Sequence, residues 1–176
     1  MKKSLFLWQI IGITFTAVLG TILHFIYEWT KAIWLTPISA INESTWEHMK
    51  LLFFPSLIFA IAQCLHFKDT LKNFWCVKLI VIIFGVLLIP TLFYTYNGTL
   101  GKSPDWFNIL IFFIADISSY TLEGYLFKFK KEFPKLCKLS FFTLILITAT
   151  FIYFTYYPPI LPIFKDPLSN LYGLIL

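Results

Sequence analysis

A short polar segment between two apolar runs carries the side chains best suited to chemistry. It covers residues 42–50, and its ionisable side chains are two carboxylates, an imidazole and an ammonium: Glu43, Glu47, His48 and Lys50. The end of the preceding apolar run adds His24 and Glu28. Because the whole chain has only nine acidic residues and three histidines, this concentration marks a candidate site.

Two imidazoles close to several carboxylates would form a metal site, since these groups bind zinc, iron and manganese. His24 and Glu28 are four residues apart and share a helical face. If the run that ends near Glu28 packs antiparallel to the run that begins near residue 45, all these groups converge at one end of the two helices. Neither H-E-x-x-H nor E-x-x-H is present, so the spacing does not specify the metal.

A later apolar run carries acidic residues at helical spacing. Asp116, Tyr120 and Glu123 recur at intervals of four and three. A charge at the centre of a bilayer costs about 2.5–3.5 kcal/mol on insertion scales, so Asp116 must face the interior, be protonated or be paired. We expect Asp116 to be a metal ligand from a third helix or to make a hydrogen bond between helices. Glu123 is expected to be neutralised by Lys128 or by solvent.

We therefore predict a divalent metal site near one end of the helices, with zinc, iron and manganese as alternatives. The predicted ligands are His24, His48, Glu43 and Asp116. Glu47 or Glu28 would be the catalytic base acting on a metal-bound water, whose pKa such a metal lowers toward 7. No residue is predicted to bind an organic cofactor.

The polar segment also has a purely structural explanation. Ser44 and Glu47 fit a capping box, in which both side chains bond to free amides at the start of a helix. Glu43, Glu47 and Lys50 are spaced four and three residues apart, which predicts a solvated salt-bridge stripe. This explanation gives no role to the histidines.

The elements that must position these groups are membrane helices. The chain is 59% hydrophobic and only 13% charged, with a mean hydropathy of +0.78, whereas soluble domains are roughly 25% charged. Five apolar runs have the length of about 20 residues that crosses a bilayer, and we place them near 5–28, 45–66, 76–96, 106–127 and 139–157. We predict an all-α bundle of five transmembrane helices forming a single membrane domain over residues 1–176.

The lysines predict the orientation of the bundle. With the N-terminus inside, the cytoplasmic side would carry Lys2, Lys3, Lys68, Lys72, Lys78, Lys128, Lys130, Lys131, Lys135 and Lys138. The outer side would carry Lys31, Lys50, Lys102 and Lys165. This asymmetry favours an N-in, C-out topology, which places the candidate site in the outer leaflet. The lysines lie at helix ends and no groove-reading motif is present, so we expect no nucleic-acid partner.

Three smaller features complete the expected fold. Cys64, Cys76 and Cys137 fall near cytoplasmic helix ends in this topology, and an odd number of thiols in a reducing compartment predicts free cysteines. Asn97-Gly98 predicts a turn. The proline-rich tail after residue 157 is expected to lie extended across the outer face.

Two segments carry a resemblance to a known family. They are His24–Trp29 followed by Asn42–Lys50, with the pattern N-E-S-x-W-E-H-x-K, and the tail from Tyr157 to Gly173. Together they resemble an uncharacterised family, a domain of unknown function found in small bacterial polytopic membrane proteins. The resemblance covers nearly the whole chain and implies a shared membrane fold and a bacterial cytoplasmic membrane, but no activity.

Three functions remain open from the sequence. The first is a metal-dependent intramembrane hydrolase acting on a lipid or peptide bond. The second is a small-solute or proton-coupled binding or transport protein that uses Asp116 and the outer cluster, for which a homodimer is expected. The third is a structural subunit of a membrane complex. All three have the lipid bilayer as their partner.

Overall fold

The structure, a computed structural model, describes residues 2–67, 71–101, 104–128 and 131–174. Its long elements are five helices: α1 (Lys2–Thr30), α2 (Thr45–Phe67), α3 (Phe74–Leu100), α4 (Asp105–Leu126) and α5 (Pro134–Tyr156). Two short 3-10 helices, η1 (Ile33–Leu35) and η2 (Pro162–Phe164), lie in the connections. All five long helices are apolar enough to cross a membrane. The predicted all-α class and the five spans are confirmed.

The helices form because a lipid-exposed backbone must satisfy its own hydrogen bonds. Their bounds follow the apolar runs closely, with one clear difference. The predicted turn at Asn97-Gly98 is wrong, because α3 continues through both residues to Leu100. It ends at Gly101, whose φ of 85° lies in the left-handed region that glycine adopts without strain.

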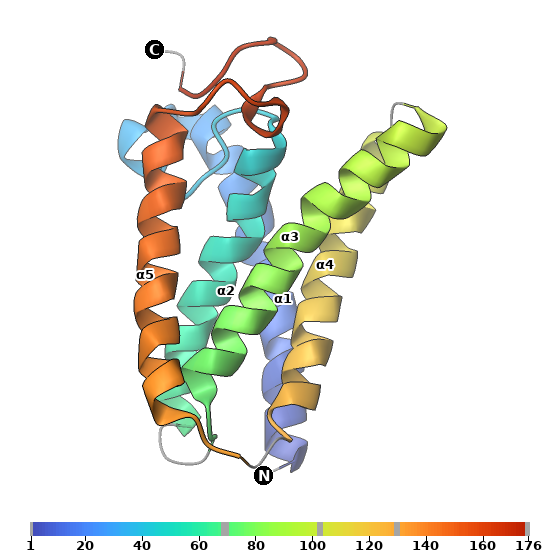
Figure 1. Ribbon diagram of the computed structural model, residues 1–176. Coiled ribbons are helices and arrows are strands. Elements are labelled where there is room, and N and C mark those ends of the chain that lie inside the picture. The colour runs from blue at the N-terminus through green and yellow to red at the C-terminus, as the bar shows by residue number, and fades with distance from the viewer. Residues whose placement is uncertain (1, 68–70, 102–103, 129–130, 175–176) are drawn as a thin grey trace.

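Four helices form the centre of the bundle, and α5 packs on its outside (Figure 1). The neighbouring pairs are α1 with α2, α2 with α3, α3 with α4 and α4 with α1, while α5 packs on α3. Phe151 of α5 also reaches α2, where its ring contacts Phe53 at 4.8 Å and Trp46 at 4.5 Å. The N-terminus and the C-terminus lie at opposite ends of the bundle (Figure 1), which we call the N-terminal end and the C-terminal end.

A glycine allows α3 and α4 to approach closely near the middle of the bundle. A Cβ atom on Gly85 would lie 2.1 Å from Ser119 Oγ and 3.3 Å from the Ala115 carbonyl oxygen. Any larger residue would therefore push α4 away from α3. The close approach brings the buried polar face of α4 against α3.

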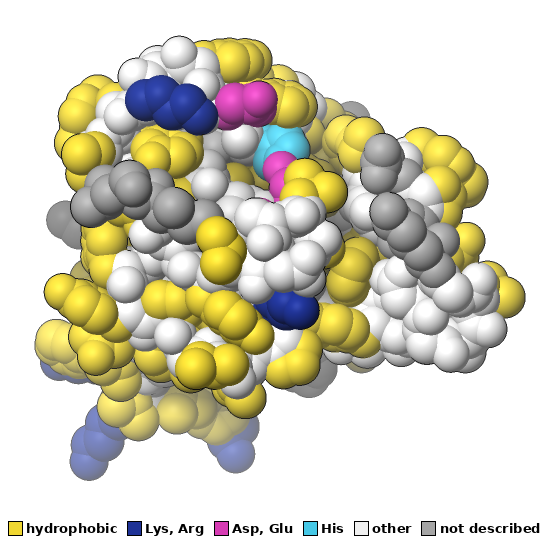
Figure 2. Space-filling model, turned by 90° about the horizontal axis from the view of Figure 1, so that it is seen from above, with side chains coloured by type: hydrophobic (Ala, Val, Ile, Leu, Met, Phe, Trp, Pro, Cys, Tyr) yellow, Lys and Arg dark blue, Asp and Glu magenta, His cyan; other side chains and the backbone are white. Residues whose placement is uncertain are grey.

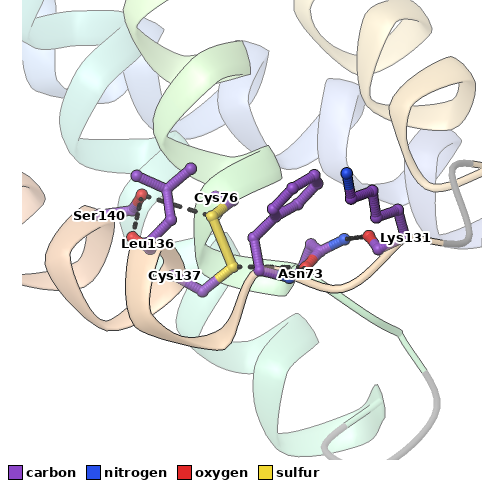
Figure 3. The surroundings of a disulfide bond; sticks show 7 residues. Asn73, Cys76, Lys131, Leu136, Cys137 and Ser140 are labelled. Carbon is purple, nitrogen blue, oxygen red and sulfur yellow. Dashed lines mark hydrogen bonds between the residues drawn. A yellow bond between two sulfur atoms is a disulfide. The ribbon is translucent and has the colours of Figure 1, made fainter.

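The expectation of free cysteines is wrong for two of the three. Cys76 of α3 and Cys137 of α5 form a disulfide at the N-terminal end, with Cα atoms 4.6 Å apart (Figure 3). Asn73 connects the start of α3 to the segment before α5 near this disulfide. Its side-chain amide donates to the Lys131 carbonyl and its side-chain oxygen accepts from Phe133 N. The bridge joins residues 61 positions apart, which the spacing of the cysteines could not indicate.

The tail is folded and covers the C-terminal end instead of lying extended. It contains η2 and a bridge between Lys165 and Tyr172 (Figure 1). Phe164 is buried, with its ring 4.6 Å from that of Trp46. Among the lysines used to predict the orientation, Lys68, Lys102 and Lys130 lie outside the described residues.

Candidate metal centre

Three of the predicted ligands meet at the C-terminal end of α1 and α2. His24 lies on the last turns of α1, Glu43 lies in the loop before α2, and His48 lies on the first turn of α2. Their side chains remain partly exposed, at 24%, 43% and 33% respectively. This is the convergence that antiparallel packing of the two helices predicted.

The three residues each offer one ligand atom, and these atoms lie within 4.8 Å of one another. Glu43 stands between the histidines, with Oε1 3.9 Å from His24 Nε2 and Oε2 3.4 Å from His48 Nε2. Ligand atoms around a tetrahedral zinc ion lie about 3.3 Å apart, because zinc binds nitrogen and oxygen at about 2.0–2.2 Å. The Glu43–His48 pair already has this separation, and His24 needs only a small side-chain movement.

The backbone of α2 fixes the orientation of the His48 ring. Its Nδ1 lies 2.9 Å from the Ser44 carbonyl oxygen, which can only accept a hydrogen bond, so Nδ1 carries the proton. In the neutral ring, Nε2 then presents its lone pair toward Glu43. A backbone carbonyl that fixes the tautomer in this way is the usual support of a metal-bound histidine.

The loop that carries Glu43 is held by the tail. Asn42 donates from Nδ2 to the Gly173 carbonyl, 3.1 Å away, and accepts on Oδ1 from Ser44 N. Asp166 accepts a hydrogen bond from the backbone of Glu43. Burial opposes the ionisation of Asp166, but hydrogen bonds from Ser169 and backbone amides outweigh it and lower the pKa of this carboxyl. An ionised Asp166 therefore anchors the tail to the loop that carries Glu43.

A pocket of about 130 Å³ adjoins the cluster on the side of α1. Glu28, Tyr27 and Lys31 line it together with His24 and Glu43. Seen from above the C-terminal end, histidine and acidic side chains gather beside a lysine within a mainly hydrophobic and neutral surface (Figure 2). Glu28 is exposed and so can meet water or a ligand that enters this pocket.

Glu47 lies apart from the cluster and is engaged by other groups. It is buried, and Oε2 lies 2.6 Å from Lys50 Nζ and accepts from Ile41 N at 3.1 Å. The predicted cap is half present, since Glu47 N donates to Ser44 Oγ while the Glu47 carboxylate turns to Lys50. The predicted solvated stripe is wrong, because Lys50 has no exposed surface.

Asp116 is also absent from the group of described residues that could hold a metal. It is fully buried on α4, and neither of its carboxylate oxygens has a hydrogen-bond partner among the described residues. Glu123, farther along α4, is paired with Lys78 of α3 at 2.8 Å. The expectation that Lys128 or solvent neutralises Glu123 is wrong.

Comparison with known protein families gives one match. The model of a family of unknown function, DUF6512, matches residues 1–174. The chain belongs to this family. No characterised protein and no solved structure matches the chain. Membership supports the predicted resemblance and brings no activity with it, while the five apolar helices fit a multi-pass membrane protein.

Several residues of the site were not predicted. Lys50 was expected in a solvated stripe with two carboxylates, and Lys78 was expected only as one of the cytoplasmic lysines. Asp166 lies in the tail, 123 residues beyond the Glu43 that it positions. The sequence did contain a signal for the burial of Lys50, because four apolar residues follow it directly: Leu51, Leu52, Phe53 and Phe54.

Proposed function

We propose that the protein is a membrane-embedded metal protein in which His24, Glu43 and His48 hold one divalent transition-metal ion. The observation that carries this proposal is the separation of the three ligand atoms, all within 4.8 Å of one another. Two histidines and one carboxylate are a ligand set used for catalytic zinc and for non-haem iron. The lysine asymmetry would place this site at the outer surface, whereas the Cys76–Cys137 disulfide at the opposite end of the bundle favours an oxidising compartment there.

We further propose metal-dependent hydrolysis as the reaction class. Three protein ligands leave a fourth position for water, and a metal in such a site lowers the pKa of that water toward 7. Glu28 lines the pocket beside the ligands and is the proposed base that takes the water proton. Glu47 is a poorer candidate for this role, since Lys50 and the Ile41 amide occupy its carboxylate.

The metal content of purified protein tests the first proposal. Protein purified without chelators is equilibrated with zinc, passed through a desalting column and analysed by elemental mass spectrometry. We expect about one zinc per chain in the wild type and at least tenfold less in His48→Ala and Glu43→Gln. Zinc affinity should fall as the pH drops, because protons compete with the metal for the imidazoles.

His66→Ala is the matched control. His66 belongs to the opposite end of α2, where its ring stacks on Trp8 at 4.6 Å. This variant should retain the zinc content of the wild type. Equal zinc in His48→Ala, or equal loss in His66→Ala, would contradict the site.

The role of Glu28 is tested separately with Glu28→Gln. This change removes the base and keeps all three ligands, so zinc content should stay at the wild-type value. Hydrolysis of a fluorogenic phospholipid or acyl-ester probe in nanodiscs should fall by about 10²–10⁴-fold, the usual contribution of a general base. Unchanged hydrolysis in Glu28→Gln would remove the base role without affecting the metal site.

A further inference from the structure

A second polar site lies inside the bundle, separate from the metal centre. It is a small cavity bounded by α2, α3 and α4, with polar lining from Ser56, Lys78, Ser119, Tyr120 and Glu123. Val81 and Ile82 complete the wall. Every lining residue is buried, with 6% exposure or less, so this is an interior site.

The ion pair in this wall leaves hydrogen-bonding capacity unused. Lys78 Nζ donates to Glu123 Oε1 at 2.8 Å, and its other close contacts are the ring faces of Phe74 and Tyr120, both 5.6 Å away. An ammonium has three donors. Glu123 Oε2 is buried and has no hydrogen-bond partner among the described residues. Buried polar atoms in folded proteins are almost always bonded to protein or to ordered water.

Hydroxyl groups continue from the cavity toward α1. Tyr120 lines the cavity, and its hydroxyl lies 3.1 Å from Thr16 Oγ1 and within hydrogen-bonding range of Ser56. The charged and titratable groups that face Glu123 are Lys78 from α3 and Tyr120 from its own helix. Among the described residues of α1 and α2, the hydrogen-bonding groups that contact this network belong to the uncharged Thr16, Gln9 and Ser56.

The volume of the cavity limits which ligand it can hold. Its volume is about 10 Å³, close to the smallest space that holds one water molecule. A water there would have a carboxylate oxygen, an ammonium and hydroxyl groups as partners, whereas a buried water usually makes about three hydrogen bonds. Organic ligands need pockets of roughly 300 Å³ or more and are excluded.

We propose that this cavity is a binding site for one exchangeable water molecule and that the hydrated Lys78–Glu123 pair is a proton-relay site within the bundle. The water donates to Glu123 Oε2, accepts from Lys78 Nζ and connects the pair to the hydroxyl groups of Ser56, Tyr120 and Thr16. Hydroxyl groups, a carboxylate and water in series are the parts from which membrane proteins build proton pathways.

The second buried pair, formed by Lys50 and Glu47, is a control for the Lys78–Glu123 pair within the same protein. Lys50 Nζ has three acceptors, which match its three donors: Glu47 Oε2 at 2.6 Å, the Thr36 carbonyl at 3.0 Å and Thr155 Oγ1 at 2.9 Å. Both pairs are buried and have the same chemistry. They differ in the number of acceptors for the ammonium among the described residues, three for Lys50 and one for Lys78. A water-sized cavity adjoins the Lys78 pair, so solvent exchange should separate the two pairs.

The experiment measures hydrogen exchange at the two ammonium groups. Protein labelled with ¹⁵N-lysine and ¹³C-glutamate is placed in lipid bilayers and transferred to D₂O, and solid-state NMR follows each Nζ signal. The two buried lysines are assigned by through-space transfer to the carboxyl of the glutamate that pairs with them. We expect the N–H signal of Lys78 to decay at least tenfold faster than that of Lys50.

A cavity-filling variant links the exchange to the proposed water. Ser56→Val places a methyl group in the cavity and should slow Lys78 exchange to the rate of Lys50. Thr121→Val also replaces a hydroxyl by a methyl group, on the exposed face of α4, and should leave the exchange of Lys78 fast. Equal protection of the two lysines in the wild type would overturn the proposal, and so would fast exchange of Lys78 that persists in Ser56→Val. The wild-type comparison does not depend on whether Ser56→Val folds.

Discussion

The two buried lysine–glutamate pairs differ in how completely the surrounding protein bonds them. Near the C-terminal end, Lys50 has three acceptors, and Glu47 accepts from both Lys50 and the Ile41 amide. Deeper toward the N-terminal end, Lys78 and Glu123 bond to each other, Glu123 lines a cavity, and its Oε2 has no hydrogen-bond partner in the described part of the chain. Burial costs both pairs desolvation free energy, but only the Lys50–Glu47 pair has a full set of protein hydrogen bonds to offset this cost.

From this difference we infer that the Lys50–Glu47 pair stabilises the fold, whereas the Lys78–Glu123 pair suits the proposed proton relay. The acceptors of Lys50 come from three segments: the η1 connection, α2 and α5. The Lys50–Glu47 pair therefore joins these three segments, two of which are also linked by the hydrogen bond between the Thr36 and Tyr156 hydroxyl groups. The Lys78–Glu123 pair joins only α3 and α4 and keeps free hydrogen-bonding capacity, which a proton-exchanging site requires.

The largest expected effect is the loss of the saturated pair. Glu47→Ala leaves the Lys50 ammonium buried without its counter-ion, and breaking a buried pair in this way costs about 3–5 kcal/mol. The free energy of unfolding in mixed micelles, titrated with SDS, measures this cost. Glu43→Ala is the matched control, because the exposed Glu43 makes ion pairs that are screened by solvent and should change stability by about 1 kcal/mol or less. Equal losses in the two variants would refute the contrast.

Replacing both members of each pair sharpens the comparison. The double change Lys78→Met with Glu123→Leu should recover most of the stability lost in Lys78→Met alone, since apolar replacement of a buried pair is often neutral or stabilising. Lys50→Met with Glu47→Leu should remain destabilised by roughly 2 kcal/mol or more, because the Thr36 carbonyl and the Ile41 amide lose their partner. SDS titration of the two double variants and of the single variants Lys78→Met and Lys50→Met measures both results. Full recovery at both sites would show that the bonding of the two pairs is equivalent.

A smaller effect is expected from one of the acceptors of Lys50. Thr155→Val removes the hydroxyl that accepts from Lys50 Nζ and leaves one ammonium donor without a partner, at a cost of about 1–3 kcal/mol. Thr150→Val is its control on the same helix, because the Thr150 hydroxyl bonds to the Leu146 carbonyl one turn earlier. Thermal unfolding followed by circular dichroism should separate the two variants. Identical midpoints would show that Lys50 does not need its third acceptor.

The smallest effect belongs to an ion pair on the surface. Lys72 and Glu132 form a salt bridge with more than half of each side chain exposed. Lys72→Met should change the unfolding free energy by only about 0–1 kcal/mol, and less at high salt. The same thermal measurement at low and high ionic strength tests this expectation. A loss as large as that in Glu47→Ala would mean that burial does not determine the importance of these pairs.

Sequence reasoning found the elements of the fold because lipid imposes a simple requirement on them. Each span needs about 20 apolar residues, and those runs are visible in the chain without any knowledge of packing. The meeting of His24, Glu43 and His48 was predictable for the same reason, since antiparallel neighbours joined by a short connection bring the end of one helix to the start of the next.

The pairings inside the bundle were not predictable, because they depend on how helices rotate against one another. Lys78 was expected only as one of the cytoplasmic lysines. It pairs with Glu123, 45 residues away, because α4 approaches α3 closely at Gly85. The disulfide was unpredictable for the same reason, because the sequence does not show which faces of α3 and α5 are adjacent. Asp166 supports Glu43 only because the tail folds back over this end.

The link between Cys76 and Cys137 has a topological consequence. It closes a covalent ring that runs up α3, down α4 and back to the first turn of α5. Asp116, Tyr120 and Glu123 all lie within that ring. If the peptide chain is cut between α3 and α4, the α4 segment stays covalently attached to α3 through α5 and the disulfide. A protease nick after Gly101 would then yield two fragments that migrate as one species on a gel until a reductant separates them.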